Sequence, residues 1–211
     1  MRSIKSGGFT LIELVVVIVI LGILAAVAVP KFMDLQRDAR ISKLNGLMAA
    51  IKSAGHITLS KSVIAGIEQY PADNSVQELD LHYLCLDGSA SDRCDVSNGI
   101  AVSYGYPAVL NNPPTIEKET SGILRALDID YRKHNAADRK DHDWQYKVKK
   151  VSEQDVHMLI GPSDIELPEY NVSGGVIDEA SKKGCYVVYG NPHKDANGSI
   201  KRVIDISTDG C

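Results

Sequence analysis

An uninterrupted apolar run near the N-terminus constrains this chain more than any other feature. The run extends from Phe9 to Val29, 21 residues, and Glu13 is its single charged residue. As an α-helix with a rise of ~1.5 Å per residue it would cover ~30 Å, the thickness of the hydrocarbon core of a bilayer. The run is therefore long enough to cross a membrane, and its one carboxylate requires an explanation.

Two ordinary explanations of the N-terminus conflict with that carboxylate. A conventional secretory signal would use Arg2 and Lys5 as its basic region, residues 14–24 as its apolar region and 26–28 as its cleavage site. A plain membrane anchor is the second alternative. Both must bury Glu13, and a carboxylate costs roughly 2.5 to 3.5 kcal/mol at mid-membrane. An acid at this depth indicates a polar partner.

A third explanation comes from the residues around the start of the run. The segment Gly8-Phe9-Thr10-Leu11-Ile12-Glu13, before about fifteen apolar residues, resembles the class III signal of type IV pilins and pseudopilins. In that family prepilin peptidase, a membrane enzyme, cuts after the glycine and methylates the new amino group. The resemblance implies a leader peptide of residues 1–8, cleavage between Gly8 and Phe9, and methylation of Phe9.

Charge pairing then explains Glu13. Cleavage creates a positive amino group inside an apolar layer, where two isolated charges are each unfavourable and an opposite pair is far less so. When one subunit docks beside another, Glu13 of one can meet the Phe9 amino group of its neighbour. This pair would set the axial register of a filament. The alternative is that Glu13 only extends its carboxylate towards the interface.

Length and charge limit the rest of the molecule. The 211 residues are 44% hydrophobic and 24% charged, which allows one ordinary domain beyond the apolar helix. Without Arg2 and Lys5 the formal charge falls from -4 to 21 minus 27, or -6, so no nucleic-acid partner is expected. The same two bases place the N-terminus in the cytoplasm and the rest outside.

The helix is predicted to continue beyond Pro30. Apolar residues recur at helical spacing, with charged residues on other faces; they are Ile41, Leu44, Leu47, Met48, Ile51 and Ala54. We therefore expect one helix from about Phe9 to about Leu59, ~75 Å long. It divides into an apolar transmembrane and assembly part, 9–30, and an amphipathic half, 31–60. Its first half must project, because a compact domain does not need this length.

Gly22 and Pro30 are the weak points of the predicted helix. Glycine costs ~1 kcal/mol relative to alanine and proline ~3 kcal/mol, because the proline ring lacks an N–H and collides with the carbonyl four residues back. One outcome is a simple kink. In type IV pilin filaments the matching interval loses helical structure, so the resemblance implies melting of residues 22–29.

Short strands follow the helix, in a globular head of residues 61–211. A connecting region of about 61–99 precedes a sheet and a disulfide-bounded C-terminal region of about 100–211. The predicted strands are Ile100 to Tyr106, Gln145 to Val151, Val156 to Ile160, Cys185 to Tyr189 and Ser199 to Ile206. We expect a hairpin from the last two strands and a short helix from Thr120 to Leu127. The resulting fold is α+β, with a single antiparallel sheet on the C-terminal half of the long helix, as in the type IV pilin fold.

The four cysteines of an exported chain predict two disulfides, for which three connectivities exist. Local pairing, Cys85 with Cys94 and Cys185 with Cys211, is the preferred one. The second bond would fasten the end of the chain, which otherwise frays. Pilins similarly display a C-terminal disulfide-bounded region. Free or metal-bound thiols are the alternative, but no two-residue cysteine spacing supports a metal site.

Shorter matches narrow the resemblance to one branch. The segments 28–40, 44–47, 103–107, 185–189 and 210–211 are similar to the mannose-sensitive haemagglutinin (MSHA) branch of type IVa pilins. The charged segment 110–150, with the lone Trp144, matches no part of that branch.

Nothing in the sequence indicates catalysis or a cofactor. The histidines show no metal-binding or catalytic spacing. The cluster Asp138, Asp141, His142 and Asp143 could bind a cation, but a solvated charged loop is the preferred interpretation. The segment 195–199 resembles part of a calcium loop without its distant glutamate, so a hairpin turn is preferred. We expect no active site and no metal site.

The sequence thus favours a structural pilin subunit that polymerises into a surface filament used for attachment. Its partners would be copies of itself, prepilin peptidase, the inner-membrane assembly machinery and, before assembly, the membrane. It would move from the inner membrane to an extracellular pilus, and the sequence identifies no surface ligand. The alternatives are a pseudopilin or minor pilin of a type II secretion apparatus, and a membrane-tethered enzyme or binding domain.

Overall fold

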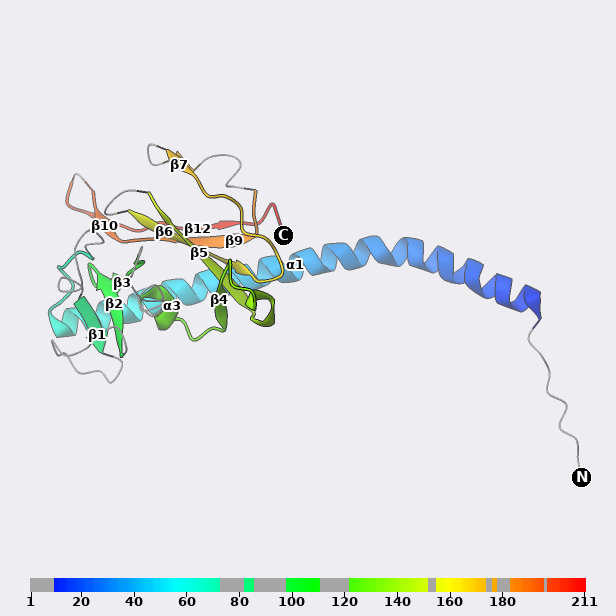
Figure 1. Cartoon of the computed structure of the whole chain (residues 1–211), viewed down its shortest axis with the longest axis horizontal. Helices are drawn as coiled ribbons and strands as arrows, with labels where there is room; N and C mark the ends of the chain where they lie inside the picture. The colour runs from blue at the N-terminus through cyan, green and yellow to red at the C-terminus, as the bar shows by residue number, and fades with distance from the viewer. Residues whose placement is uncertain are drawn as a thin grey trace, which may run out of the picture. The chain divides into compact units, whose positions relative to one another are not determined.

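The computed structural model describes residues 10–72, 82–85, 98–110, 122–151, 155–173, 176–177, 183–195 and 197–211. The chain divides into two compact units, residues 1–39 and residues 40–211. Both units contribute to one helix, α1, and the strands that the structure describes lie in residues 40–211 (Figure 1).

Helix α1 extends over Leu11–Ala65, 55 residues, and passes without a break through Gly22 and Pro30. It runs past the predicted end near Leu59. A glycine stops it, because Gly66 adopts φ +72° and donates to the carbonyl of Val63, while Ile67 donates to that of Ser62. This pair of bonds is the Schellman motif, in which a left-handed glycine closes the helix.

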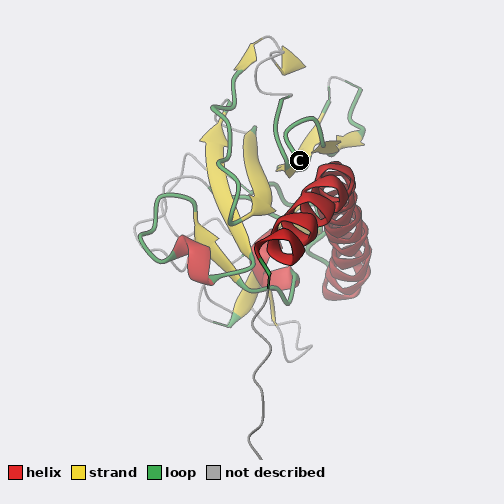
Figure 2. Cartoon of the chain, turned by 90° about the vertical axis from the view of Figure 1, so that its right-hand side faces the viewer, coloured by secondary structure: helices red, strands yellow, loops and turns green. Residues whose placement is uncertain are grey.

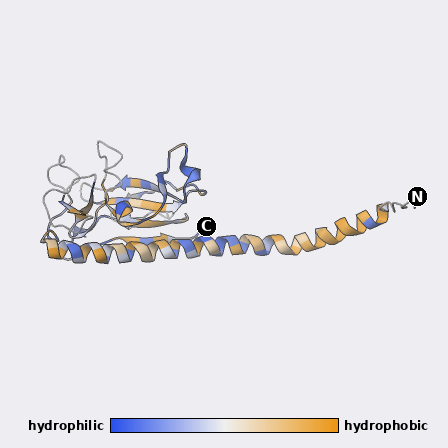
Figure 3. Cartoon of the chain, turned by 90° about the horizontal axis from the view of Figure 1, so that it is seen from below, coloured by the Kyte–Doolittle hydropathy of each residue, from blue (hydrophilic) through white to orange (hydrophobic). Residues whose placement is uncertain are grey.

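The C-terminal part of α1 buries one face. Apart from the adjacent pair Ala54 and Gly55, its buried residues follow one another at steps of three or four, as one face of a helix requires; they are Leu44, Leu47, Ile51, Ala54, Gly55, Thr58 and Ser62. Figure 3 shows hydrophobic colour over most of the N-terminal part of α1 and interspersed hydrophilic residues further along. The predicted stripe is confirmed at Leu44, Leu47, Ile51 and Ala54, whereas Ile41 and Met48 lie at its margin and are half-buried.

The main sheet has five strands in the order β12-β9-β6-β5-β4. Figure 2 shows the strands in yellow and the helices in red. Their bounds are Ile204–Ser207 for β12, Tyr186–Gly190 for β9, Val156–Pro162 for β6, Trp144–Lys150 for β5 and Tyr131–Lys133 for β4. Neighbours pair antiparallel, except that β4 runs parallel to β5. The predicted α+β class, with the C-terminal half of a long helix packed on an antiparallel sheet, is confirmed.

The expectation of one single sheet is wrong. Strands β1 (His82–Cys85), β2 (Gly99–Ser103) and β3 (Tyr106–Pro107) form a separate antiparallel sheet. The predicted strand Ile100 to Tyr106 is broken because Tyr104 and Gly105 adopt φ +48° and φ +78°. Left-handed backbone of this kind ends a strand and reverses the chain.

The last two predicted strands do pair, since β9 and β12 are antiparallel neighbours. A small ribbon of β10 (His193–Lys194) and β11 (Ile200–Lys201) lies in their connection, so the predicted strand Ser199 to Ile206 is divided in two. The remaining elements are α3 (Ile123–Ala126), the 3-10 helix η2 (Arg139–Asp141), β7 (Val172–Ser173) and β8 (Val176–Ile177). Helix α3 lies within the predicted helix Thr120 to Leu127, of which Thr120 is outside the described residues.

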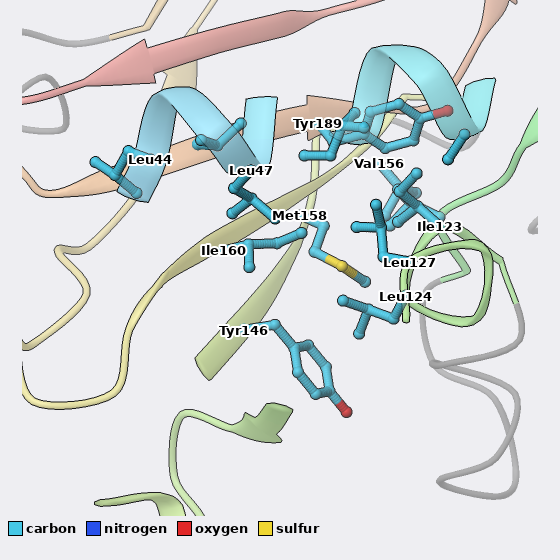
Figure 4. Close-up of a cluster of buried hydrophobic side chains, with 14 of the residues drawn as sticks. Leu44, Leu47, Ile123, Leu124, Leu127, Tyr146, Val156, Met158, Ile160 and Tyr189 are labelled. Carbon is cyan, nitrogen blue, oxygen red and sulfur yellow. The ribbon is translucent and has the colours of Figure 1, made fainter. Parts of the chain in front are cut away.

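Both faces of the main sheet are covered. The face towards α1 contributes Tyr146, Val156, Met158, Ile160, Val187 and Tyr189 to the main core (Figure 4). The opposite face, which we call the outer face, contributes Leu159, Tyr186 and Val188 to a second cluster with Leu167 and Tyr170. Successive residues of β6 and β9 therefore serve opposite faces, as the pleat of a strand requires.

Candidate functional site

The first turn of α1 holds the predicted Glu13 carboxylate in a defined position. Glu13 Oε2 accepts hydrogen bonds from the backbone N–H and from the Oγ1 hydroxyl of Thr10, both at 2.8 Å. Thr10 Oγ1 in turn accepts from the Glu13 N–H at 3.3 Å. These reciprocal bonds form a capping box, which satisfies N–H groups that a helix start otherwise leaves unpaired. The capping box thus holds the carboxylate at the helix start.

Thr10 is a residue that the sequence interpretation missed. The spacing Thr-x-x-Glu ahead of an apolar run is the sequence signature of a capping box, so the signal was present in residues 10–13. Gly8 and Phe9, the predicted cleavage and methylation residues, lie outside the described residues. The structure therefore gives a geometry for Glu13 but none for its predicted partner.

The apolar part of α1 is exposed all round. Its large apolar side chains from Leu11 to Val29 are 42% to 79% exposed, and Phe32, Met33 and Leu35 continue this surface beyond Pro30. By length and composition α1 is long and apolar enough to cross a membrane. A contiguous apolar surface of this extent needs lipid or other protein chains to cover it.

Gly22 and Pro30, the predicted weak points, are both helical in this structure. An added side chain at Gly22 would meet nothing within 4 Å, so packing within this chain does not require glycine there. Pro30 leaves the Ala26 carbonyl without its usual helical donor. Melting of residues 22–29 in a filament stays a prediction.

The end of the chain is fastened by a covalent bond and by an arginine. Cys185 and Cys211 form a disulfide with a Cα–Cα distance of 4.8 Å. Arg40 of α1 donates from Nη1 to the Cys211 carbonyl at 3.3 Å and from Nη2 to Asp164 Oδ2 at 2.7 Å. Cys85 is also disulfide-bonded, and Cys94 lies outside the described residues.

The charged cluster around His142 is held by hydrogen bonds between its side chains. His142 Nδ1 lies 2.7 Å from Asp130 Oδ1, and this hydrogen bond lowers the pKa of Asp130. Asp138 receives two bonds from Arg132, which likewise lower its pKa. Within the part of the chain that the structure describes, no group of three or more His, Cys, Asp and Glu residues could hold a metal ion.

In the segment 195–199, of which residue 196 lies outside the described residues, the chain turns back on itself. Asp195 Oδ1 accepts the N–H groups of Asn197 and Ser199, each at 2.9 Å, and Gly198 adopts φ +78°. The aspartate oxygen is therefore used by the backbone of its own loop. This geometry agrees with the predicted hairpin turn between β10 and β11.

One buried polar group was not predicted. His157, on the outer face, places Nδ1 2.9 Å from the Tyr170 hydroxyl and Nε2 2.8 Å from Asp155 Oδ1. The His157 hydrogen bond lowers the pKa of Asp155, while burial opposes this effect. Burial also raises the pKa of Tyr170. Because His157 and Tyr170 are 3% and 1% exposed, the group is structural rather than accessible to a substrate.

Comparisons with known proteins match both the N-terminus and most of the chain. Residues 4–29 match the family model of the prokaryotic N-terminal methylation motif. The type IV narrow pilus major component PilA5 of Thermus thermophilus is 52% identical over 50 residues, 24% of this chain and 43% of that protein. The chain thus spans less than half the length of this relative.

Two further relatives differ in how far their similarity extends. A fimbrial protein of Pseudomonas aeruginosa is 30% identical over 144 residues, which cover 68% of this chain and 86% of that protein. The type II secretion system core protein G of P. aeruginosa is 46% identical over 54 residues, 26% of this chain and 38% of that protein. No solved structure matches the chain significantly.

Proposed function

We propose, since the chain belongs to the type IV pilin family, that this structural subunit polymerises through the N-terminal part of α1 into an extracellular filament that serves surface attachment. Its relatives are named as pilins and fimbrial proteins, which are structural proteins. Family membership supports a membrane-anchored precursor that assembles with copies of itself into a pilus filament.

The observation that carries this proposal is the exposed apolar surface of residues 11–35. No soluble state of a single subunit covers it, because its side chains are exposed on all sides of the helix. A bilayer covers it before assembly, and the helices of neighbouring subunits cover it in a filament. Exchange of one apolar environment for another lets the subunit leave the membrane without exposing this surface to water.

The processing steps follow from the motif at residues 4–29. We propose cleavage between Gly8 and Phe9, removal of the leader 1–8 and methylation of Phe9. The mature chain would then comprise the assembly helix 9–30, the amphipathic half 31–60 and the head 61–211. Precursors would lie in the inner membrane and mature subunits in the surface filament.

The Thr10–Glu13 box supports the proposed pairing of Glu13 with the Phe9 amino group of a neighbour. Since Thr10 fixes the Glu13 carboxylate at the helix start, the side chain loses little further freedom on pairing. We also propose that the chain belongs to the MSHA branch of the family. Residues 22–29 would lose their helical structure on assembly.

A pseudopilin or minor pilin of a secretion apparatus is the second candidate. The similarity to the secretion protein G supports it, but that similarity covers 26% of this chain, against 68% for the fimbrial protein. The shared N-terminal helix suffices to explain the shorter match. A filament-forming pilin therefore accounts for more of the chain.

Replacement of Glu13 by Ala tests the assembly mechanism. We expect Glu13→Ala subunits to be cleaved at Gly8 normally and to yield few sheared filaments, since the Phe9 amino group then lacks its partner. Asp34→Ala, at an exposed acid of the same helix, is the matched control and should assemble normally. Filaments of normal amount and length from Glu13→Ala subunits would contradict the charge-pairing mechanism.

A further inference from the structure

The outer face of the main sheet is covered by a segment that belongs to no strand. Residues 166–171, which we call the strap, follow β6 and precede β7 (Figure 1). Leu167 and Tyr170 point from the strap into the cluster formed with Leu159, Tyr186 and Val188. Leu167 is 4% exposed and Tyr170 is 1% exposed, so the strap keeps this face of the sheet away from water.

Ion pairs to two separate elements fasten the strap. Glu166 accepts from Arg139 of η2 at 2.6 Å, and Glu169 accepts from Lys147 of β5 at 2.6 Å. The two acids are 71% and 80% exposed, whereas the side chains of both bases are 17% exposed. The two bases are therefore held within the folded head, and the two acids of the strap are exposed to solvent.

Arg139 keeps other bonds that do not depend on the strap acids, whereas Lys147 also donates to the Pro168 carbonyl of the strap itself at 3.5 Å. Arg139 also donates to the His134 carbonyl at 2.9 Å and to Gln145 Oε1 at 3.4 Å. These contacts hold the guanidinium in place if Glu166 moves away. Departure of the strap consequently leaves the position of η2 on β5 intact.

The segment before the strap is anchored independently. Gln145 is fully buried and donates from Nε2 to the carbonyls of Pro162 and Ile165. Ile165 packs against the main core, and Asp164 pairs with Arg40. Residues 162–165 therefore form a fixed base from which the strap extends.

We propose that the strap is a releasable cover of the outer face, which opens when its two ion pairs are screened or neutralised while the sheet and α1 stay folded. The main core on the other face contains neither Leu167 nor Tyr170, so opening does not expose it. Opening would present Leu159, Tyr186 and Val188, an apolar surface, next to the cations of Arg139 and Lys147.

A fall in pH should open the strap, as a rise in salt concentration should. The hydrogen bond from Arg139 lowers the pKa of Glu166, and that from Lys147 lowers the pKa of Glu169. His134 and Lys149 are the other charged or titratable groups that act on these acids, and Asp155 with His157 lies beneath Tyr170. A carboxyl with a lowered native pKa contributes stability above its ordinary pKa, and this contribution is lost as the pH falls through the lowered native pKa. The strap should open in acid.

Hydroxyl-radical footprinting of buried tyrosines in the full-length protein in detergent micelles measures this opening. Tyr170 belongs to the strap, and Tyr186 of β9 packs in the cluster beneath it. Tyr146 and Tyr189 lie in the main core, and all four tyrosines are at most 2% exposed. Loss of one exposed ion pair should raise the open population about 2- to 5-fold. We therefore expect the Glu166→Gln, Glu169→Gln double variant to label Tyr170 and Tyr186 roughly tenfold faster, without change at Tyr146 and Tyr189.

Salt and a matched variant complete the test. In the unmodified chain, high NaCl should accelerate labelling of Tyr170 and Tyr186, and in the double variant it should have little further effect. Asp138→Asn removes an acid that is 45% exposed and pairs with Arg132, not with the strap, so it should leave all four tyrosines unchanged. Unchanged labelling of Tyr170 and Tyr186 in the double variant, or an equal rise at all four tyrosines, overturns the proposal.

Discussion

Arg40 of helix α1 donates a hydrogen bond to the backbone carbonyl of Cys211, 171 residues away, at 3.3 Å. Cys211 is itself joined to Cys185 next to β9, so one residue connects the helix with the disulfide-bonded terminal segment. The same guanidinium pairs with Asp164 at 2.7 Å. The terminal segment is therefore bound at two points, by the disulfide and by a charge-assisted hydrogen bond from Arg40.

Replacement of Arg40 should loosen that segment without unfolding the head. We expect Arg40→Gln to lower the free energy of unfolding by about 1 kcal/mol, because a partly exposed charge-assisted contact is lost. Urea denaturation of the full-length protein in micelles measures this change. Arg37→Gln, at an exposed arginine one turn earlier, is the control and should have no measurable effect. Equal stabilities of the two variants would show that the Arg40 contacts contribute nothing.

The capping box predicts a different effect at the helix start. Thr10→Val removes the hydroxyl that donates to Glu13 and accepts from its N–H, whereas Thr10→Ser keeps it. Loss of an N-cap side chain costs about 1 kcal/mol, which is ~5-fold in a local opening equilibrium. NMR hydrogen exchange of the amides of residues 11–14 should therefore be ~5-fold faster in the Val variant. Identical exchange rates in the Val and Ser variants would show that the Thr10 hydroxyl does not stabilise the helix start.

The half-buried Asp155 beside the buried His157 gives a pH dependence with a definite sign. The hydrogen bond to His157 lowers the pKa of Asp155, and His193 acts weakly in the same direction. A carboxyl with a lowered native pKa contributes stability above its ordinary value, and this contribution is lost as the pH falls through the native value. The free energy of unfolding, measured from neutral to acid pH, should thus decline less steeply for Asp155→Asn than for the unmodified chain. Asp209→Asn changes an exposed acid, and its free energy of unfolding should decline with pH as steeply as that of the unmodified chain. The same slope in both variants would contradict this assignment.

Local sequence patterns predicted the parts of the fold that depend on local chemistry. The three- and four-residue spacing from Leu44 to Ala54 predicted the buried face of α1. Alternating or continuous apolar residues predicted β5, β6 and β9. The end of α1 was misplaced because the connecting region was expected to begin near residue 61, although Gly66 follows the helical pattern and glycine in that place is a stop signal. The capping box at Thr10 was likewise readable in the sequence.

Other features could not be predicted because they depend on distant parts of the chain. A left-handed Tyr104 has no sequence signal, since residues other than glycine rarely adopt that backbone. Strand β4 pairs parallel with β5 only after the intervening loop has folded back. The contacts of Arg40 and the strap join residues that become neighbours through tertiary packing, so spacing along the sequence says nothing about them.

The central claim is that the exported subunit begins at Phe9 and assembles into filaments through its apolar helix. Mass spectrometry of the N-terminal peptide, taken from filaments sheared from the cell surface, tests it most directly. The account predicts a filament subunit whose chain starts at Phe9 and carries one methyl group on its amino group. A subunit that starts at another residue, or the absence of this chain from the filaments, would contradict it.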